Sequence, residues 1–219
     1  MNKTFRFLII AFFIIQFGFS NAQNFGIKGG LNLSTMLSKD NDQRYSDNFS
    51  AITGIHFGFT YEHPLTNIVS VSSEILLSNK GMKYDFSEDE AKISSDIKLY
   101  YIDLPVMLKS RYDLGNGMKL YGATGPYVGI GLRGQSQTST VYQDDSTCEK
   151  RDIEWGTGPN DNLRRLDWGW TFSGGLQIEK IELGIAYDVG FANIAANRNN
   201  GTIARNRVVK ASIAYQFGK

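Results

Sequence analysis

The sequence predicts an all-β protein, a single eight-stranded antiparallel up-and-down transmembrane β-barrel that follows a cleavable signal peptide. Three observations predict this fold. Residues 1–22 have the layout of an export signal, eight later segments alternate apolar and polar residues, and short connections alternate with long ones. No apolar run after residue 22 approaches the length of a spanning helix. A closed barrel is then the remaining way to cross a membrane, because lipid offers no hydrogen-bond partner to an open sheet edge.

The first 22 residues resemble a secretory signal peptide. Lys3 and Arg6 precede an apolar run at 7–19, and the small residues Ser20 and Ala22 stand at the positions that a signal peptidase recognises. We expect cleavage after Ala22, which leaves residues 23–219 as one outer-membrane β-barrel domain. The alternative is an uncleaved anchor, but the run of about 13 residues is shorter than the ~20 that a spanning helix needs.

Eight segments of the remaining chain alternate with a period of two, which is typical of β-strands. In each segment one face is aliphatic and aromatic, and the other carries Gly, hydroxyl and charged residues. Most segments have about 9–12 residues, which matches a tilted membrane strand and exceeds the ~5–6 usual in soluble sheets. The predicted strands are residues 25–33, 51–62, 68–78, 99–112, 119–133, 167–178, 181–191 and 207–217.

The connections between these strands differ in length in a regular order. Those at 63–67, 113–117 and 179–180 are short, whereas 34–50, 79–98, 134–166 and 192–206 are long and polar. Short periplasmic turns and long external loops are typical of outer-membrane barrels. The order places both termini on the periplasmic side and predicts the outer membrane of a Gram-negative bacterium as the location, after export.

Composition excludes several other classes of protein. Lys3 and Arg6 belong to the export signal, which leaves 21 basic against 22 acidic residues, so no basic face for nucleic acid is expected. Cys148 is the single cysteine, so there is no disulfide framework, and we interpret it as a loop residue. We expect no cofactor. Calcium binding by Asp144, Asp145 and Glu149 is disfavoured, because one short segment rarely supplies six to eight oxygen ligands.

The inner face of the predicted barrel carries both signs of charge. An eight-stranded barrel is just wide enough for its interior to be filled by side chains, and buried charges need partners. We therefore expect a paired charge network, with a proton relay or binding site as the alternative, and Glu74 with Lys109 or Arg111 as one pair. The predicted network comprises Lys28, His56, Glu74, Asp103, Lys109, Arg111, Asp188 and Lys210, and Glu62, Asp167 and Glu182 share its face.

Three further expectations concern the side chains. His56 is expected to be a hydrogen-bonded filler beside Glu62 or Glu74 rather than a catalyst. No catalytic, metal-binding or nucleotide-binding motif occurs in the sequence. Aromatic residues near strand ends on the apolar face fit the interfacial girdles of membrane barrels. The predicted girdle comprises Phe25, Tyr61, Tyr112, Trp168, Trp170, Tyr215 and Phe217.

Several short motifs carry a resemblance to a known family. They are FGIKGGLNLS at 25–34, EILLSNKG at 74–81, YIDLPVMLK at 101–109, GPYVG at 125–129 and YQF at 215–217. Together they resemble the Bacteroidota outer-membrane β-barrel domain family, which includes PorT-like proteins. The resemblance spans residues 23–219 and implies a small barrel of the OmpA/OmpX kind. It says little about activity, since most members of the family are known only as barrels.

The sequence leaves three functions open. The first is a non-enzymatic structural or binding barrel whose outer loops contact a lipid, glycan or protein. The second, which the PorT-like resemblance implies, is an accessory role in secretion or envelope biogenesis. The third is an outer-membrane enzyme, which the absence of His from the long loops disfavours. The expected partners are outer-membrane lipid, the barrel-insertion machinery, and a surface or periplasmic protein.

Two alternatives concern the kind of barrel and the width of its interior. A porin is disfavoured, because a channel needs a wider barrel. A soluble lipocalin-type barrel would place the apolar face inward, around a ligand. A lipid-soluble probe separates these folds, because it labels Phe57, Val106 and Ile185 only if they face lipid.

Overall fold

The computed structural model of the chain describes residues 24–88, 91–142, 145–158 and 160–217. The expected signal peptide at 1–22 lies outside them. Among the described residues, no helix has the length and apolar character needed to cross a membrane. The ten strands are β1 (Asn24–Lys39), β2 (Phe49–Ser50), β3 (Ile52–Pro64), β4 (Val69–Glu88), β5 (Ala91–Gly115), β6 (Met118–Tyr142), β7 (Asp145–Asp152), β8 (Leu166–Ile178), β9 (Ile181–Gly190) and β10 (Ile203–Gln216). Two short 3-10 helices, η1 (Tyr45–Asn48) and η2 (Asn199–Gly201), lie in the connections.

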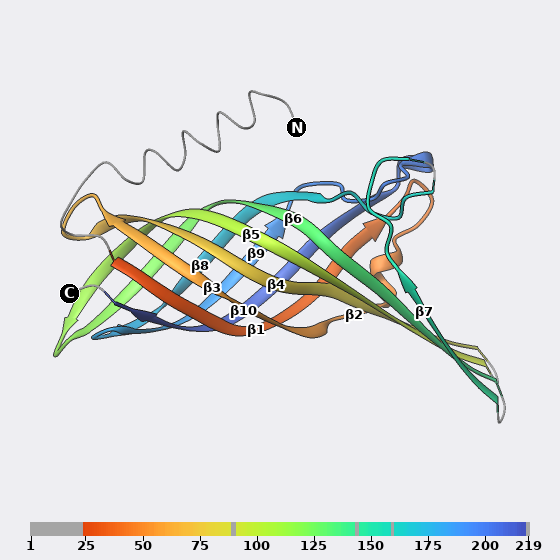
Figure 1. Cartoon of the computed structure of the whole chain (residues 1–219), viewed down its shortest axis with the longest axis horizontal. Coiled ribbons are helices and arrows are strands. Elements are labelled where there is room, and N and C mark those ends of the chain that lie inside the picture. The colour runs from red at the N-terminus through yellow and green to blue at the C-terminus, as the bar shows by residue number, and fades with distance from the viewer. Residues whose placement is uncertain (1–23, 89–90, 143–144, 159, 218–219) are drawn as a thin grey trace.

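Eight of these strands form a closed antiparallel ring, so the predicted fold is confirmed. The order around the ring is β1, β3, β4, β5, β6, β8, β9 and β10, and β10 pairs with β1 to close it. The remaining two strands stand outside the ring, since β2 pairs with β4 and β7 pairs with β6. The eight strands lie tilted around one long bore, which we use as the name for the interior of the ring (Figure 1).

The two ends of the barrel differ as the connection lengths predict. The three short turns lie at one end, which we call the turn end, together with the two ends of the described chain (Figure 1). One of them is Gly115-Asn116-Gly117, in which all three residues have positive φ, a conformation that Gly and Asn adopt most readily. The long connections, including η1 and η2, lie at the opposite loop end (Figure 1).

Two of the predicted long loops are wrong, because most of their residues continue as strand. Residues 79–88 extend β4, 91–98 extend β5, 134–142 extend β6, and 145–152 form β7. These parts make an extended sheet that projects beyond the barrel at the loop end (Figure 1). Ser and Thr occupy many positions of this sheet, beside apolar residues such as Met82 and Ile97, and Ser95 and Thr138 pair with a hydroxyl distance of 3.2 Å. The many Ser, Thr and charged residues of this sheet give it the composition of a polar loop, which is why the sequence did not predict its strands.

The outer face of the barrel wall is apolar and the inner face is polar, as predicted. The side chains of Ile55, Phe57, Phe59 and Ile185 are 56–67% exposed on the outside. His56, between the first two, is 1% exposed and points into the bore. An apolar exterior over a polar interior matches a barrel in lipid and is the reverse of the lipocalin-type alternative.

We expect Ile185→Arg to lower the free energy of unfolding by about 2–4 kcal/mol, because it places a charge on the lipid face near the middle of β9. Ile178→Arg, on the same face at the turn end, is the matched control and should cost about 0–1 kcal/mol. Urea unfolding in phospholipid vesicles measures both. Equal costs at the two positions would show that this surface does not face lipid.

Candidate functional site

The bore is filled by ion pairs, and the first group lies next to the turn end. Glu62 near the end of β3 receives hydrogen bonds from the guanidinium of Arg111, and its carboxylate lies 3.3 Å from Lys109 Nζ. Glu182 of β9 lies 2.6 Å from Lys109 Nζ and 3.1 Å from Arg111. Arg111 also donates to Gln177 at 2.8 Å. Two cations and two carboxylates from three strands therefore bind one another across the bore.

The second group differs from the predicted pairing. Glu74 does not pair with Lys109 or Arg111 but with Lys28 of β1, at 2.8 Å. The strands β4 and β5 are neighbours, yet the inward side chain of Glu74 reaches past β3 to Lys28 on β1, the next strand but one on the other side. The opposite charge nearest to Glu74 is therefore set by the stagger of β4, β3 and β1 and not by adjacency of strands alone.

His56 has neutral partners rather than the expected carboxylates. Its Nδ1 lies 2.7 Å from Asn32 Oδ1 and its Nε2 lies 3.0 Å from Ser212 Oγ. None of the ion pairs within the described residues involves His56, and the predicted neighbours Glu62 and Glu74 pair elsewhere. The histidine serves as a hydrogen-bonded filler that joins β1, β3 and β10.

The third group, which we call the aspartate cluster, lies toward the loop end. It comprises Asp103, Asp167 and Asp188 with Lys80 and Lys210, and every side chain is at most 5% exposed. Lys80 Nζ lies 2.7 Å from Asp103 and 3.4 Å from Asp167. Lys210 Nζ lies 2.6 Å from Asp188 and 3.7 Å from Asp103. Sequence reasoning missed Lys80, because it placed residue 80 in a polar loop.

All eight residues of the predicted charge network lie on the inner face of the barrel. Tyrosines complete the filling. Lys80 Nζ lies 4.7 Å from the ring centre of Tyr101 and 5.0 Å from that of Tyr127, and Lys109 Nζ lies 4.4 Å from that of Tyr121. Cations over aromatic faces are stabilised by the ring quadrupole, more strongly when water is excluded.

An apolar cap covers the aspartate cluster at the loop end, and the sequence did not predict it. Its buried residues are Met36, Leu99, Tyr101, Ala192, Ile194, Ala195 and Ala204, with Phe49, Met82, Ile97, Ile153, Trp155 and Leu163 packed against them. The Trp155 ring meets that of Tyr101 edge-on, with centres 5.8 Å apart. Arg164 N–H donates to Ile194 O at 2.7 Å, and Ile194 N–H donates to Ala204 O at 2.9 Å, so two connections are tied across this end.

A glycine in β6 permits this packing. A Cβ at Gly131 would lie 2.5 Å from the Trp155 ring, so any other residue would displace the indole. The cap residues that come from the two connections lie without a regular period in 153–163 and 192–196; they are Ile153, Trp155, Leu163, Ala192, Ile194 and Ala195. Since such spacing matches neither helix nor strand, only the folded chain identifies them as a core.

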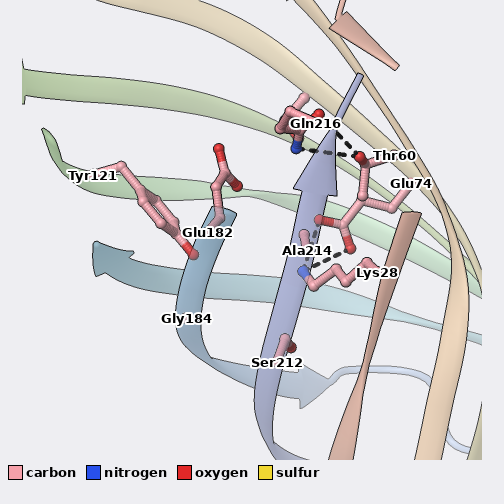
Figure 2. A pocket seen from close by; sticks show the side chains of 10 residues that line it. Lys28, Thr60, Glu74, Tyr121, Glu182, Gly184, Ser212, Ala214 and Gln216 are labelled. Carbon is pink, nitrogen blue, oxygen red and sulfur yellow. Dashed lines mark hydrogen bonds and ion pairs between the residues drawn. The ribbon is translucent and has the colours of Figure 1, made fainter. Parts of the chain in front are cut away.

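A small cavity lies among the ion pairs and tyrosines inside the barrel. Figure 2 shows a cavity in the bore, with Lys28 and Glu74 on one side and Tyr121 and Glu182 on the other. Its volume is about 10 Å³, close to the minimum that one water molecule needs. A larger open hollow of about 700 Å³ lies at the turn end, where Arg111, Gln177 and Lys180 are among its lining residues. We call this hollow the turn-end vestibule.

The predicted girdle aromatics stand on the outer face. Phe25 and Tyr61 lie on paired strands with ring centres 5.0 Å apart, and Tyr215 and Phe217 are 5.3 Å apart. The residues toward the turn end are Phe25, Tyr61, Tyr112, Tyr215 and Phe217, and those toward the loop end are Trp168 and Trp170. Their contact with the lipid headgroups stays a prediction.

The described parts of the surface connections hold no candidate metal site. Within the residues that the structure describes, no three His, Cys, Asp or Glu side chains are grouped to hold an ion. Asp144 lies outside those residues, and Glu149 pairs with Arg151 at 2.8 Å. Cys148 is free and exposed, but it lies in strand β7 and not in a loop, so that part of its interpretation is wrong.

One carboxylate in these connections is held by three donors. Asp40 accepts from the Tyr45 hydroxyl at 2.6 Å and from the N–H groups of Asp42 and Gln43 at 2.8 Å each. These bonds, the hydroxyl foremost, hold the pKa of Asp40 below its ordinary value. The turn is therefore favoured above the ordinary pKa of Asp, and this preference is lost as the pH falls through the lowered value.

Tyr45→Phe should raise the pKa of Asp40 toward its ordinary value, because the largest of these stabilising bonds is removed. Carboxyl-detected NMR titration of Asp40 measures the change. Tyr112→Phe, at the turn end, is the control and should leave the titration unchanged. An unchanged Asp40 titration in Tyr45→Phe would mean that the hydroxyl does not bond the carboxylate.

A family model described as "outer membrane protein beta-barrel domain" matches residues 16–196. The chain belongs to this family. As a member of the outer membrane protein beta-barrel domain family, it is an outer-membrane protein, as the sequence predicts. The match does not distinguish PorT-like members from others.

Solved structures of outer-membrane proteins are similar to this family member at low identity. Ail, the attachment invasion locus protein of Yersinia pestis, is 15% identical with a TM-score of 0.40, over 90% of this chain and 100% of that one. OprG of Pseudomonas aeruginosa is 15% identical with a TM-score of 0.46, over 90% and 97%. Neisserial surface protein A is 10% identical with a TM-score of 0.44, over 90% and 100%. The comparison with curated proteins gives no match.

Proposed function

We propose that this barrel is a non-enzymatic outer-membrane protein with a structural or binding role, exerted through its loop end. The observation that carries the proposal is the filled bore. Ion pairs, tyrosines and the apolar cap occupy the interior, and the cavity among them holds about 10 Å³. A solute has no path through such an interior, which leaves the outward surface as the part available for function.

The extended sheet and the connections at the loop end offer that surface. They expose residues of both charge signs, among them Arg44, Lys83, Asp85, Arg133 and Asp152. A mixed polar surface on a rigid sheet suits a polar partner, such as a glycan or a protein, better than a lipid tail. Neither histidine lies there, since His56 is in the bore and His63 is near the turn end of β3, which supports a binding role over catalysis.

A second candidate is an accessory role in secretion or envelope biogenesis. It rests on the resemblance to PorT-like proteins and on the turn-end vestibule of about 700 Å³, which would open toward the periplasm. That vestibule offers Arg111, Lys119 and Lys180 to a periplasmic protein. In both candidates the barrel-insertion machinery and outer-membrane lipid are partners during biogenesis.

A shortened variant tests the first proposal. Lys83, Asp96, Gln137 and Lys150 lie side by side on four neighbouring strands. Joining Lys83 to Asp96 and Gln137 to Lys150 through Asn-Gly turns therefore removes the tip of the extended sheet and keeps the register. Cys148→Ser, which retains the sheet, is the matched control.

Both proteins are inserted in lipid nanodiscs and applied to a glycan and protein array, and conductance is recorded in planar bilayers. We expect array signals that the control retains and the shortened variant loses, with no conductance from either protein. Retention of every signal by the shortened variant, or open-channel current from the control, would contradict the proposal. Loss of a periplasmic protein's signal on Lys119→Ala, but not on shortening, would favour the second candidate.

A further inference from the structure

The aspartate cluster has one more carboxylate than it has cations. The other buried groups are balanced, since Lys28 pairs with Glu74 and the turn-end group has two cations and two carboxylates. In the cluster, three Asp side chains that are 0–2% exposed face only two Lys side chains. A buried charge without a partner is costly, so the third carboxylate needs a compensating proton or cation.

The distances identify which carboxylate is in excess. Lys80 is closest to Asp103, at 2.7 Å, and Lys210 is closest to Asp188, at 2.6 Å. The other oxygen of Asp103 lies 3.7 Å from Lys210, so Asp103 stands between both cations and is favoured as an anion. Asp167 has a single cation, Lys80, at 3.4 Å.

The hydrogen bonds of the Asp167 carboxylate all go to one of its two oxygens. Its Oδ2 accepts from Asn206 Nδ2 at 2.9 Å, from the Tyr127 hydroxyl at 3.2 Å and from Lys80. Its Oδ1 is buried and has no hydrogen-bond partner among the described residues. The Oδ1 of Asn206 is likewise buried without a hydrogen-bond partner among the described residues, although Nδ2 of the same amide donates to Asp167. Two buried acceptors on facing side chains each lack a donor, and each costs free energy.

We propose that Asp167 binds a proton in the folded barrel and that its carboxylic acid pairs with the Asn206 amide. The proton comes from solvent and forms an O–H bond at Oδ1, and no other bond breaks. The new hydroxyl donates to Asn206 Oδ1 while Asn206 Nδ2 continues to donate to Asp167 Oδ2, which closes a cyclic acid–amide pair. One added proton satisfies both orphaned oxygens and leaves two carboxylates for two lysines.

Every strand around Asp167 contributes a group to this environment. The groups that face it are Lys80 from β4, Tyr101 and Asp103 from β5, Tyr127 from β6, Asp188 from β9, and Asn206 and Lys210 from β10. A cation other than a proton would need several oxygen ligands, and no metal-binding group is present in the described part of the chain. A positive charge on His56 is disfavoured as the counterion, because its partners are the neutral Asn32 and Ser212.

Three Asp→Asn variants separate a neutral Asp167 from a charged one. Asn at 167 presents an N–H where the acid would present its O–H, so Asp167→Asn should stay within about threefold of wild type in its unfolding equilibrium constant. Asp188→Asn and Asp103→Asn each remove a charge that a buried lysine needs, and should raise that constant roughly 100-fold or more. Urea unfolding of the full chain in phospholipid vesicles at pH 4, where Asp side chains of the unfolded chain are about half protonated, measures all three.

The pH dependence of the unfolding constant tests the protonation of Asp167 independently. A folded state that holds one more proton than the unfolded chain loses stability as the pH rises. The unfolding constant of wild type relative to Asp167→Asn should therefore rise about tenfold per pH unit above about pH 4, until the folded acid itself ionises. A ratio that stays constant or falls with pH would contradict the proposal.

A spectroscopic measurement covers the case in which a variant fails to fold. In wild type at pH 7, infrared spectroscopy should show the C=O stretch of a protonated carboxylic acid, shifted by ¹³C-aspartate labelling and absent from Asp167→Asn. The absence of a protonated-aspartate band from wild type, or equal destabilisation by Asp167→Asn and Asp188→Asn, would overturn the assignment. A band that persists in Asp167→Asn would place the proton on another carboxyl, and would overturn it as well.

Discussion

Glu62→Gln is expected to lower the free energy of unfolding by about 3–5 kcal/mol, one of the two largest effects that the structure predicts. Glu62 is 3% exposed and binds Arg111 and Lys109 together. Its loss leaves these two cations with one carboxylate, that of Glu182. The cost comes from the unpaired buried charge rather than from the lost attraction alone. Urea unfolding in phospholipid vesicles measures it.

An exposed ion pair serves as the control for this change. Asp152 lies 3.4 Å from Arg133, and both side chains are more than half exposed. Asp152→Asn should cost about 0–1 kcal/mol, because water already solvates both charges. If Glu62→Gln cost no more than Asp152→Asn, the turn-end ion group would be hydrated rather than sealed.

Trp155→Ala is expected to have the second large effect, a loss of about 3 kcal/mol in the local stability of the apolar cap. The indole fills the space above Gly131 and meets the ring of Tyr101. Without it, the connections at 153–165 and 191–202 lose their shared core, while the barrel strands keep their pairing. Native-state hydrogen exchange at the Ile194 amide, which bonds Ala204, measures the opening of the cap.

Trp168→Ala removes an indole from outside the cap and is the control. Trp168 is 50% exposed on the outer face, where it packs against Phe191. It should leave exchange at Ile194 unchanged. Equal acceleration by both variants would show that the cap has no packing of its own and opens together with the barrel wall.

The barrel itself could be predicted from the sequence because its two faces meet different solvents. Lipid on one side and a crowded polar bore on the other require alternation at every strand, as the flanking of His56 by Ile55 and Phe57 illustrates. The three tight turns were also predictable, since Gly115, Asn116 and Gly117 match a backbone that few residues adopt. Each of these signals is local in the sequence.

The partners inside the bore could not be predicted in the same way. Which residue pairs with Glu74 depends on the stagger between β4, β3 and β1, and alternation carries no information on stagger. Lys80 was missed for a related reason. Its neighbours Asn79 and Gly81 on β4 are not apolar, so the alternation that marks a barrel strand stops before Lys80. The cap depends on contacts between connections far apart in the chain, such as Leu163 with Ala195.

The pairing of β1 with β10 has a consequence for how this protein is made. The ring closes between the first and last strands, with partners such as Gly26 and Gln216 far apart in the chain. Loop-closure entropy makes contacts of such long range slow to form. Until they form, both terminal strands present unpaired backbone groups on which another chain could add. Assembly therefore has to wait for β10, and a factor that shields the edge of β1 in the meantime would prevent aggregation.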